Sequence, residues 1–336
     1  MRRSCPVASG FVEPHHGPVR WGVAATGKIA AQFTTEFSQV VDSQASIDAV
    51  GSRRRETAEE FAAAHGIGRS HGSYADLAAD ADIDIVYVAS LQPGHVTDAV
   101  LFLEAGKHVL IEKPMALSAA EADRIIAAAN ANDRFAMEAM WMRFNPAPVA
   151  AVDTVASGRI GTPQRLEIDF TIEVPDDPDH RLRSLEKGGG SLLDLGIYPL
   201  TLAWWLLGPP TSWRVDGDVV NGVDTRCVVD AEWDDVTATL SCGLDRFGPV
   251  SAAITGRNGT VSLDAPFHAT HHLELDRIRH SYPPASLHWQ VDEVHRCLRS
   301  GERESPRNPL ATTRAILAWC DEIRAELGIR YPTELV

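Results

Sequence analysis

The sequence predicts an α/β protein with two domains: an N-terminal domain with a parallel sheet, and a C-terminal α+β domain with an open, mainly antiparallel sheet. The first observation is length, because 336 residues are more than twice the ~150 typical of one domain. The second is that short β-branched runs alternate with helical patterns up to about residue 140, which is typical of βαβ units. The third is that short alternating strands, joined by Gly and Asp turns, follow residue 162.

The first domain is expected at residues 19–140, after a flexible tail at residues 1–18. Its strand at Ile85–Ala89 is expected to be buried on both faces, because the run is apolar and does not alternate. Apolar periodicity places the other elements. We expect strands at Val19–Ala24, Ala45–Gly51, His108–Ile111 and Phe135–Glu138, and helices at Lys28–Ser38, Glu56–His65, His95–Ala105 and Ala119–Asn130.

The second domain is expected at residues 141–309, with helices at Pro146–Ser157 and at the more apolar Leu192–Leu207. Turn sequences such as Trp233–Asp235 separate its strands. We expect these strands at Arg165–Val174, Val228–Glu232, Val236–Leu244 and Val250–Gly256. The last segment, 310–336, contains a strong helical pattern at Leu310–Leu327 that we expect to pack back on the first domain.

Charge and composition exclude several kinds of partner. With 31 basic and 46 acidic residues, the formal net charge of −15 would repel nucleic acid and anionic membrane surfaces. Apolar residues make up 44% of the chain, yet no continuous apolar run reaches the ~20 residues that cross a bilayer. We therefore expect a globular protein with neither nucleic acid nor a membrane as a partner.

The cysteine and histidine patterns bear on location and on metal binding. The five cysteines are odd in number and form no CxxC pair, which favours reduced thiols in the cytoplasm. The N-terminal stretch has Pro, Glu and His where a signal peptide needs apolar residues. His15 and His16 are adjacent, but a loose terminus lacks the fixed geometry of a metal site, so no metal is expected.

The segment from Trp21 to Ala30 passes from a strand into a helix and has the spacing of a dinucleotide-binding turn. In such a turn, three glycine positions permit a tight bend, close approach of a pyrophosphate and close helix packing. Here these positions hold Ala25, Gly27 and Ala30, so only the central glycine is present. The turn opens the first βαβ unit and its helix start would bind phosphate, although an ordinary βα turn is the alternative. The expected cofactor contacts are Ala25, Thr26, Gly27, Lys28 and Ile29.

The end of the second strand favours NADP over NAD. Val50 and Gly51 are followed at once by Ser52, Arg53 and Arg54. An NAD site places an acidic residue here to bind the ribose hydroxyl, whereas a hydroxyl and arginines suit the 2′-phosphate of NADP. The alternative is that the arginines form a solvated start of the next helix, and NAD stays possible.

Two more motifs lie at the carboxyl ends of the expected parallel strands Ile85–Ala89 and His108–Ile111. Ligands bind at these strand ends in open α/β sheets. A lysine before a proline is ordinarily part of a surface turn, and Pro114 also permits a cis bond. Only four of the 31 basic residues are lysines, however, so a lysine here hints at a compact ammonium or an adjustable pKa. The residues concerned are Leu91, Pro93, His95, Glu112 and Lys113.

The strongest local signal is the block from Lys187 to Pro199, which begins with three glycines and continues as an apolar helix. Asp194 and Tyr198 are four residues apart, so a helix would place both on one face, where they could handle a proton. Because Pro199 lacks an N–H group, the helix is either kinked here or only beginning. The alternative is a glycine loop in which Asp194 caps a buried helix.

Together these stretches resemble the Gfo/Idh/MocA family of NAD(P)-dependent sugar and polyol oxidoreductases. The resemblance covers residues 19–324 and rests on the order of the glycine turn, Pro93 with His95, the run from Ala105 to Pro114, and the block from Gly188 to Tyr198. Within the family, Ala25, the stretch Glu138–Phe144 and Tyr198 resemble the branch of dimeric dihydrodiol dehydrogenase and NADP-dependent D-xylose dehydrogenase.

The resemblance implies a Rossmann-type first domain and a second domain whose open sheet often forms an oligomer interface, so we expect a homo-oligomer, either dimer or tetramer. It implies that Lys113, Asp194 and Tyr198 line the catalytic site. In our hypothesis Tyr198 exchanges the hydroxyl proton, the Lys113 ammonium lowers the phenol pKa by about three units, and Asp194 orients the substrate or Lys113. The expected substrate contacts are Trp141, Arg143 and Phe170.

The expected function is an NADP-dependent dehydrogenase acting on CH–OH or CH–CH donors, with a sugar, polyol or cyclic diol as substrate. The acidic composition suits an uncharged substrate better than a phosphorylated one. Two alternatives remain, a glycosidase that uses bound nicotinamide for transient oxidation and a non-catalytic dinucleotide-binding regulator. The intact set of Lys113, Asp194 and Tyr198 argues against the regulator.

Overall fold

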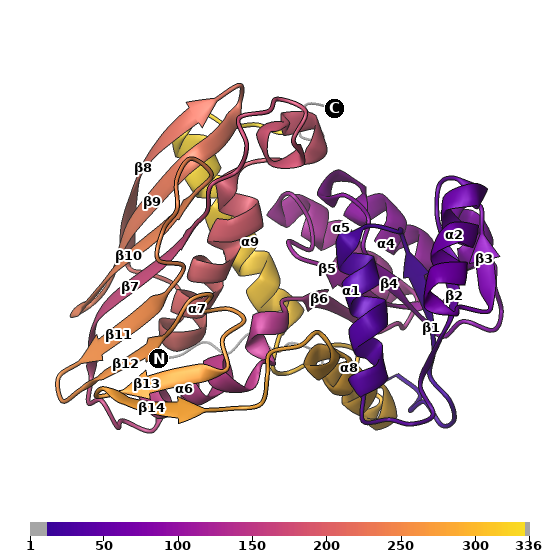
Figure 1. Cartoon of the computed structure of the whole chain (residues 1–336), viewed down its shortest axis with the longest axis horizontal. Helices are drawn as coiled ribbons and strands as arrows, with labels where there is room; N and C mark the ends of the chain where they lie inside the picture. The colour runs from indigo at the N-terminus through magenta and orange to yellow at the C-terminus, as the bar shows by residue number, and fades with distance from the viewer. Residues whose placement is uncertain (1–11, 333–336) are drawn as a thin grey trace.

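Two β-sheets organise the chain in the computed structural model, which describes residues 12–332. The first is a six-stranded sheet with the order β3-β2-β1-β4-β5-β6, in which every pairing is parallel. The second is an eight-stranded sheet with the order β14-β13-β12-β11-β7-β10-β9-β8. Figure 1 shows the first sheet in indigo and purple on one side of the molecule and the second, in pink and orange, on the other. The predicted fold class is confirmed.

The first sheet is a doubly wound one, because the chain reverses its direction of travel between β1 and β4 and leaves a crevice for a ligand at their carboxyl ends. Its apolar strands β4 and β5 are buried along their whole length. The strands are β1 (Arg20–Ala24), β2 (Ser46–Gly51), β3 (Arg69–His71), β4 (Ile85–Val88), β5 (His108–Glu112) and β6 (Ala136–Ala139). The helices are α1 (Lys28–Glu36), α2 (Arg55–His65), α3 (Tyr74–Ala78), α4 (His95–Glu104) and α5 (Ala119–Ala131).

The second sheet is antiparallel except for the pairing of β7 with β10, which is parallel. The helices α6 (Pro146–Ala156) and α7 (Ile197–Leu207) pack on one of its faces. Its strands are β7 (Pro163–Thr171), β8 (Ser212–Val220), β9 (Val223–Trp233), β10 (Val236–Gly243), β11 (Ala252–Gly256), β12 (Thr260–Leu263), β13 (His272–Leu275) and β14 (Ile278–Ser281).

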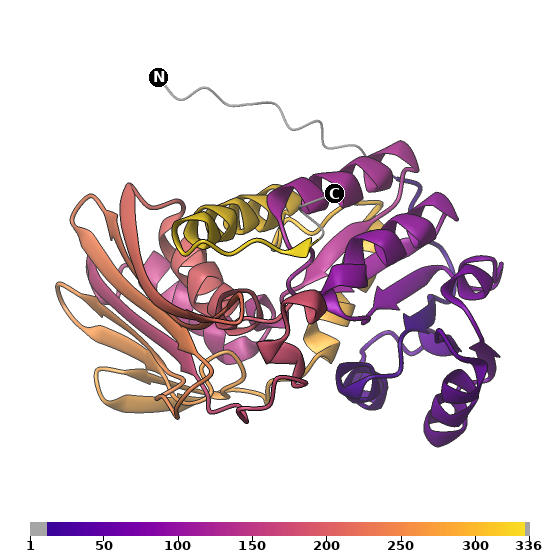
Figure 2. The same ribbon diagram turned by 90° about the horizontal axis from the view of Figure 1, so that it is seen from above.

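Two C-terminal helices return to the first sheet. The helix α8 (His288–Ser300) contributes Val291 and Val294 to the core around Trp21, whose indole N–H donates to His295 at 2.9 Å. The helix α9 (Leu310–Glu326) contacts α5 and β6 of the first sheet and also α7. Figure 2 shows α9, in yellow, lying alongside α5, so this helix forms part of the contact between the two sheets.

The expectation of a loose tail at residues 1–18 is wrong for the part that the structure describes. Val12 and His15 donate backbone N–H groups to Gly301 and Leu298 at the end of α8, at 2.8 and 2.9 Å. The Arg299 guanidinium bonds the backbone oxygens of His15 and Gly17. These bonds fix the segment because they satisfy backbone groups on both sides. Residues 1–11 lie outside the described part.

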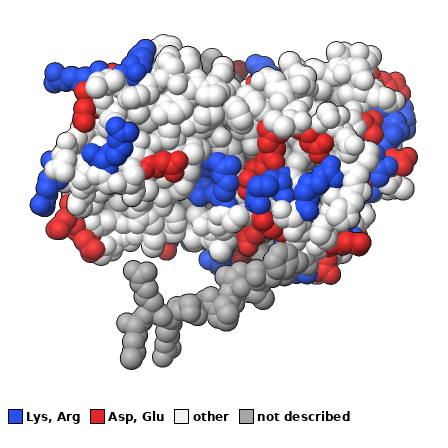
Figure 3. Space-filling model, turned by 90° about the horizontal axis from the view of Figure 1, so that it is seen from below, with Lys and Arg blue, Asp and Glu red and all other residues white. Residues whose placement is uncertain are grey.

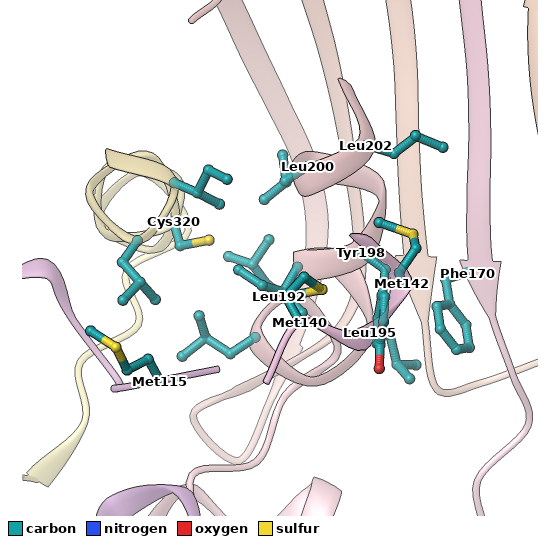
Figure 4. Close-up of a cluster of buried hydrophobic side chains, with 14 of the residues drawn as sticks. Met115, Met140, Met142, Phe170, Leu192, Leu195, Tyr198, Leu200, Leu202 and Cys320 are labelled. Atoms are coloured by element: carbon teal, nitrogen blue, oxygen red, sulfur yellow. The ribbon is translucent and has the colours of Figure 1, made fainter. Parts of the chain in front are cut away.

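Seven elements were not predicted. Five of them are too short to show a period, namely β3, α3, β12, β13 and β14. The other two, β8 and α8, span 9 and 13 residues and were missed despite their length. The stretch Leu185–Leu207 is long and apolar enough on average to span a membrane, but 78% of its most apolar window is buried inside the protein. Figure 4 shows why: Leu192, Leu200 and Leu202 of this stretch point into a core that also receives Cys320 from α9 and Met115. The stretch is therefore part of the core of a folded domain.

Candidate active site

The turn between β1 and α1 has free donors for an anion. Ala25 has φ +101°, a conformation that glycine adopts more easily, so this alanine occupies a glycine-like position. Gly27 caps α1 without a side-chain hydrogen bond, and a Cβ atom there would meet nothing within 4 Å. The first turn of α1 holds no acidic residue, and its N–H groups have no helical partner. A pyrophosphate fits these donors and the positive end of the helix dipole.

The residues after β2 present positive charge to the same edge of the sheet. Ser52 is buried, and its hydroxyl lies 2.6 Å from that of Thr57. Arg53 and Arg54 are exposed, and within residues 12–332 neither guanidinium forms an ion pair. Arg55 is exposed as well, and the base of its side chain lies against Gly72, where an added Cβ would lie 3.1 Å from that of Arg55. The two free guanidiniums and the hydroxyl fit a ribose phosphate.

The ends of β4 and β5 bring together the other expected cofactor residues, with different degrees of access. Leu91 is 47% exposed, whereas His95 is buried with both ring nitrogens near backbone oxygens, 2.9 Å from that of Pro114 and 3.0 Å from that of Ser90. Glu112 is buried, and its Oε1 atom accepts a hydrogen bond from the Tyr87 hydroxyl group, with 2.5 Å between the two oxygens. His95 and Glu112 thus hold the two loops in place from within, because their polar atoms are already engaged.

Lys113 lies where the two domains meet. The peptide bond to Pro114 is cis. The Nζ atom donates to the backbone oxygen of Asp194 at 2.8 Å, and it lies 3.6 Å from Oδ1 of that carboxylate. It also lies 5.0 Å from the centroid of the Tyr198 ring. Burial lowers the Lys113 pKa, but Asp194, together with Tyr198 and Glu112, raises it by more, so the ammonium stays protonated.

Asp194 lies in a single π-helical turn, Leu192–Gly196, that precedes α7. Pro199 is the third residue of α7, but helical backbone already runs through the π-helical turn, so the helix does not begin at this proline and the irregular turn lies directly before it. The Asp194 carboxylate accepts two hydrogen bonds from the Arg181 guanidinium, at 3.0 and 3.2 Å, and one from Gln92 at 3.1 Å. Burial raises its pKa, yet Lys113 and Arg181 lower it by more, so Asp194 is ionised.

Tyr198 is buried, and its hydroxyl accepts the indole N–H of Trp141 at 2.8 Å. The expectation that Lys113 lowers the phenol pKa to near neutrality is wrong for this state of the protein. Burial raises the pKa of Tyr198 to about 12, and the opposing effects of Lys113 and Trp141 are smaller. The physical reason is that a buried phenolate loses its hydration. In addition, the negative charge of Asp194 offsets part of the effect of the Lys113 ammonium.

Aromatic rings surround Tyr198 on the side of the second sheet. The Phe170 ring lies 5.4 Å from the Tyr198 ring, centroid to centroid, and stacks on the imidazole of His268 at 4.5 Å. Figure 4 shows Phe170 and Tyr198 close together at this end of the core. Trp141 and Phe170 therefore both lie at the site. Trp141 acts there at least as the donor to the phenol.

Arg143 does not join this group. It is buried, its Nε atom donates to the backbone oxygen of Arg307 at 2.9 Å, and its guanidinium lies 4.8 Å from the Trp205 ring centroid. Burial lowers its pKa to about 10. The structure thus engages Arg143 in the interior beside the site, so the expectation of a substrate contact has no support from its position.

Three residues of the site were not predicted. Gln92 stands between Leu91 and Pro93, two residues that were expected to contact the cofactor, so a signal was present in the sequence. Arg181 belongs to the loop between β7 and the glycine block, which carries no periodicity, and it is one of many arginines. His268 lies in the short connection between β12 and β13. Only the tertiary fold brings the last two to Asp194 and Tyr198.

A doubly wound sheet with an anion-accepting turn, facing a buried lysine and a tyrosine on a second domain, defines an NAD(P)-dependent oxidoreductase. Residues 19–140 match the NAD-binding Rossmann fold of the Gfo/Idh/MocA oxidoreductase family, and residues 149–262 match the Gfo/Idh/MocA C-terminal domain. The chain belongs to this family, which confirms the resemblance read from its motifs.

Known proteins are similar over nearly the whole chain. The trans-1,2-dihydrobenzene-1,2-diol dehydrogenase of Danio rerio is 31% identical, covering 93% of this chain and 98% of that protein. An aldose-aldose oxidoreductase from Caulobacter crescentus, solved with glycerol, has a TM-score of 0.82 at 23% identity, over 93% of this chain and 98% of that one. A 3-ketoreductase from Actinomadura kijaniata, solved with NADP and TDP-benzene, has a TM-score of 0.80 at 25% identity, over 92% and 97%.

Proposed function

We propose that the protein is an NADP(H)-dependent oxidoreductase that interconverts a hydroxyl and a carbonyl group on a sugar, polyol or cyclic diol. The observation that carries this proposal is the convergence of Lys113, Asp194 and Tyr198 beside the carboxyl ends of β4 and β5. The names of the similar proteins, which include a dihydrodiol dehydrogenase and an aldose-aldose oxidoreductase, support the same substrate classes.

Tyr198 is the group that moves the proton. Because its oxygen accepts an N–H from Trp141, its own O–H is free to be donated to a substrate oxygen. With a pKa of about 12 the phenol is protonated at neutral pH, so it serves directly as the acid that protonates a carbonyl oxygen during reduction. In the direction of oxidation the same oxygen has to receive the proton, which is favoured at high pH.

Lys113 stabilises the negative charge that develops on the substrate oxygen. Its ammonium is held by the backbone oxygen of Asp194, so it is positioned before the substrate arrives. Asp194, kept ionised by Arg181, holds Lys113 protonated and in place. The nicotinamide, when bound, supplies or accepts the hydride.

The residues after β2 support NADP as the cofactor. The described structure has the Ser52 hydroxyl and the unpaired Arg53 and Arg54 guanidiniums where an NAD-specific protein would carry an acidic residue. In the fit outlined above, Ala25 to Ile29 would hold the pyrophosphate, and Leu91 and Pro93 would lie against the nicotinamide half.

We propose that the protein self-associates into a dimer or tetramer through the outer face of the second sheet, the face that α6 and α7 leave uncovered. The helices α6 and α7 pack on the other face, while the outer face carries paired charges such as Arg226 with Asp216 and Asp218. Light scattering coupled to gel filtration measures the oligomeric state.

The four described cysteines, all buried thiols, support a reducing compartment such as the cytoplasm.

The proposed function is tested with a panel of aldoses, inositols and aromatic dihydrodiols, each assayed with NADP and with NAD. We expect reduction of NADP by at least one class, measured by the ultraviolet absorbance of reduced nicotinamide. Release of sugar from a chromogenic glycoside without net reduction would instead identify a glycosidase. Binding of NADPH with no turnover on the whole panel, in either direction, would contradict the proposal.

A further inference from the structure

His268 packs its imidazole among the rings around Tyr198. The centroid of the imidazole lies 4.5 Å from that of the Phe170 ring, with the two planes 21° from parallel. It lies 4.7 Å from the centroid of the Tyr198 ring and 5.7 Å from that of Trp141, which it meets edge to face. The residue lies in the connection between β12 and β13, and its backbone oxygen accepts a hydrogen bond from Asn145 at 3.1 Å. The loop is therefore fixed, and the imidazole is held against the side chains that surround the proposed proton donor.

The Nδ1 atom of His268 is buried and has no hydrogen-bond partner among residues 12–332. Burial, together with the positive charge of Lys113, lowers the pKa of this imidazole to about 3, so the ring is neutral. A neutral imidazole carries one N–H donor and one acceptor nitrogen. Buried polar atoms in folded proteins are nearly always paired, so an unpaired one beside a site indicates a place for a ligand atom.

The surroundings of this nitrogen define the kind of atom that would pair with it. The rings of Phe170, Tyr198 and Trp141 lie against the imidazole, and aromatic rings of this kind suit the C–H face of a saturated ring. His268 and Lys113 both lie beside the Tyr198 ring, with centroid distances of 4.7 Å from the imidazole and 5.0 Å from the Nζ atom, so both belong to the surroundings of the same phenol. A neutral nitrogen among aromatic rings pairs better with a hydroxyl group of a ligand than with a charged group.

We propose that His268 pairs through Nδ1 with a hydroxyl group of the substrate beyond the reacting carbon, and so selects polyhydroxylated rings, namely aldoses and cyclic polyols, over cyclic diols with a hydrocarbon remainder. This inference rests on the proposed function and names the substrate class. A cyclic diol offers C–H groups at the remaining ring positions, so it leaves the nitrogen unpaired. Only the polyol therefore gains a hydrogen bond at this nitrogen, and the diol gains none.

The test compares three variants of His268. One of them removes both ring nitrogens, and the other two each imitate one of these nitrogens. His268→Phe keeps an aromatic ring in contact with Phe170 and Tyr198 but removes both nitrogens. His268→Asn restores a polar atom at the position of Nδ1, whereas His268→Gln restores one at the position of Nε2. His271→Phe, at an exposed residue of the same connection, controls for the added phenylalanine.

The substrates are matched in ring size: myo-inositol and D-xylose as polyols, and trans-cyclohexane-1,2-diol as the diol. For His268→Phe we expect the KM for the polyols to rise on the order of 10-fold, the loss of one neutral hydrogen bond, with kcat changed less and the diol unaffected. His268→Asn should recover most of the loss, and His268→Gln should not. Equal changes for polyol and diol, or none, would overturn the inference.

Binding measured without turnover separates this inference from the proposed function. Calorimetric titration of the NADPH-loaded protein with each polyol should show affinity on the order of 10-fold weaker for His268→Phe than for the parent, with unchanged NADPH binding and melting temperature. If the parent turns over a substrate but the polyol affinities of parent and variant agree, only the role of His268 falls. If the parent neither binds nor turns over any polyol, the role falls together with that substrate class.

Discussion

The Nζ atom of Lys113 lies 2.8 Å from the backbone oxygen of Asp194 and 3.6 Å from its carboxylate. Lys113 follows β5 of the first sheet, whereas Asp194 lies in the π-helical turn before α7, 81 residues further along the chain. This contact joins the nucleotide-binding sheet to the second domain at the point where Tyr198 presents its phenol. The position of the ammonium therefore depends on both domains.

Tyr198→Phe should abolish most of the turnover. The substitution removes the phenol oxygen and keeps the ring packing against Phe170 and His268. We expect kcat to fall by roughly 100- to 10,000-fold, the usual contribution of a positioned acid or base, with unchanged NADPH binding. Steady-state kinetics and fluorescence titration measure the two quantities, and Tyr74→Phe, outside the site, is the control. Full turnover in Tyr198→Phe would show that another group moves the proton.

The two reaction directions should respond differently to pH. Because the pKa of Tyr198 is about 12, the phenol stays protonated from pH 6 to pH 9, so carbonyl reduction should be nearly independent of pH there. Oxidation needs the phenolate, whose fraction rises about tenfold for each pH unit below the pKa, so kcat/KM for oxidation should rise steadily over this range. Initial rates across this range test this expectation. A plateau of the oxidation rate near pH 7 would mean that the phenol is far more acidic in the working enzyme.

Arg181→Gln should shift the acidic side of the pH profile. The guanidinium is one of the two charges that lower the pKa of Asp194, so its removal raises this pKa. Asp194 then takes up a proton at higher pH and releases Lys113, so we expect the fall in kcat/KM on acidification to begin at higher pH. The control is Arg246→Gln, an exposed arginine outside the site. An unchanged acidic limb would show that Arg181 has no part in holding Asp194 ionised.

Arg53→Ala should remove the preference for NADPH over NADH. A charge-assisted hydrogen bond to a phosphate contributes roughly 1.5–3 kcal/mol, so NADPH affinity should fall roughly 10- to 100-fold while NADH affinity stays the same. Fluorescence titration gives both dissociation constants. Arg55→Ala is the matched control, because that side chain packs against Gly72. Equal affinities of the parent protein for the two cofactors would refute the NADP assignment.

Asp224→Asn should change how stability depends on pH. The Oδ2 atom of Asp224 accepts from the Ser191 hydroxyl and the Leu192 N–H, both at 2.6 Å, but burial raises the pKa to about 6. Since the folded pKa exceeds the unfolded value of ~3.9, the folded state binds the proton more tightly, and its stability falls as pH rises from about 4 to about 6.

The size of this effect is about 3 kcal/mol for a pKa difference of about two units. Urea unfolding at pH 4 and pH 7 measures it in the parent and in Asp224→Asn, which cannot ionise and should lose most of the difference. Asp176→Asn, at a carboxylate side chain that is 95% exposed, is the control. The same pH dependence in parent and variant would contradict the assignment of this titration to Asp224.

Much of the fold could be predicted from the sequence because its longer elements carry strong periodic patterns. The strands β1, β4 and β5 and the helices α5 and α9 lie within one or two residues of their expected bounds. Short strands such as β12 to β14 could not be predicted, because four residues give too few apolar positions to define a period. The segment 12–18 also escaped prediction, since the bonds that fix it come from α8, far along the chain.

The candidate site was predictable where motifs of fixed spacing lie at strand ends, as for Gly27, Lys113 and the pair Asp194 and Tyr198. It was not predictable where a contact joins distant segments. Trp141 was expected to contact substrate, yet its N–H bonds a phenol 57 residues away. Arg181 and His268 reach the site only because a loop and a strand connection are folded over it.

The sequence by itself determined the order of the elements, the parallel sheet with its phosphate-accepting turn, and the residue types available for catalysis, because these features are encoded within stretches of ten to twenty residues. Only the tertiary structure decided which side chains meet and what protonation states they have. Tyr198 is the clearest case: the motif places it near Lys113, but its pKa is raised to about 12 because packing by both domains removes water from the phenol. Burial is a property of the whole fold, so local sequence patterns do not specify it.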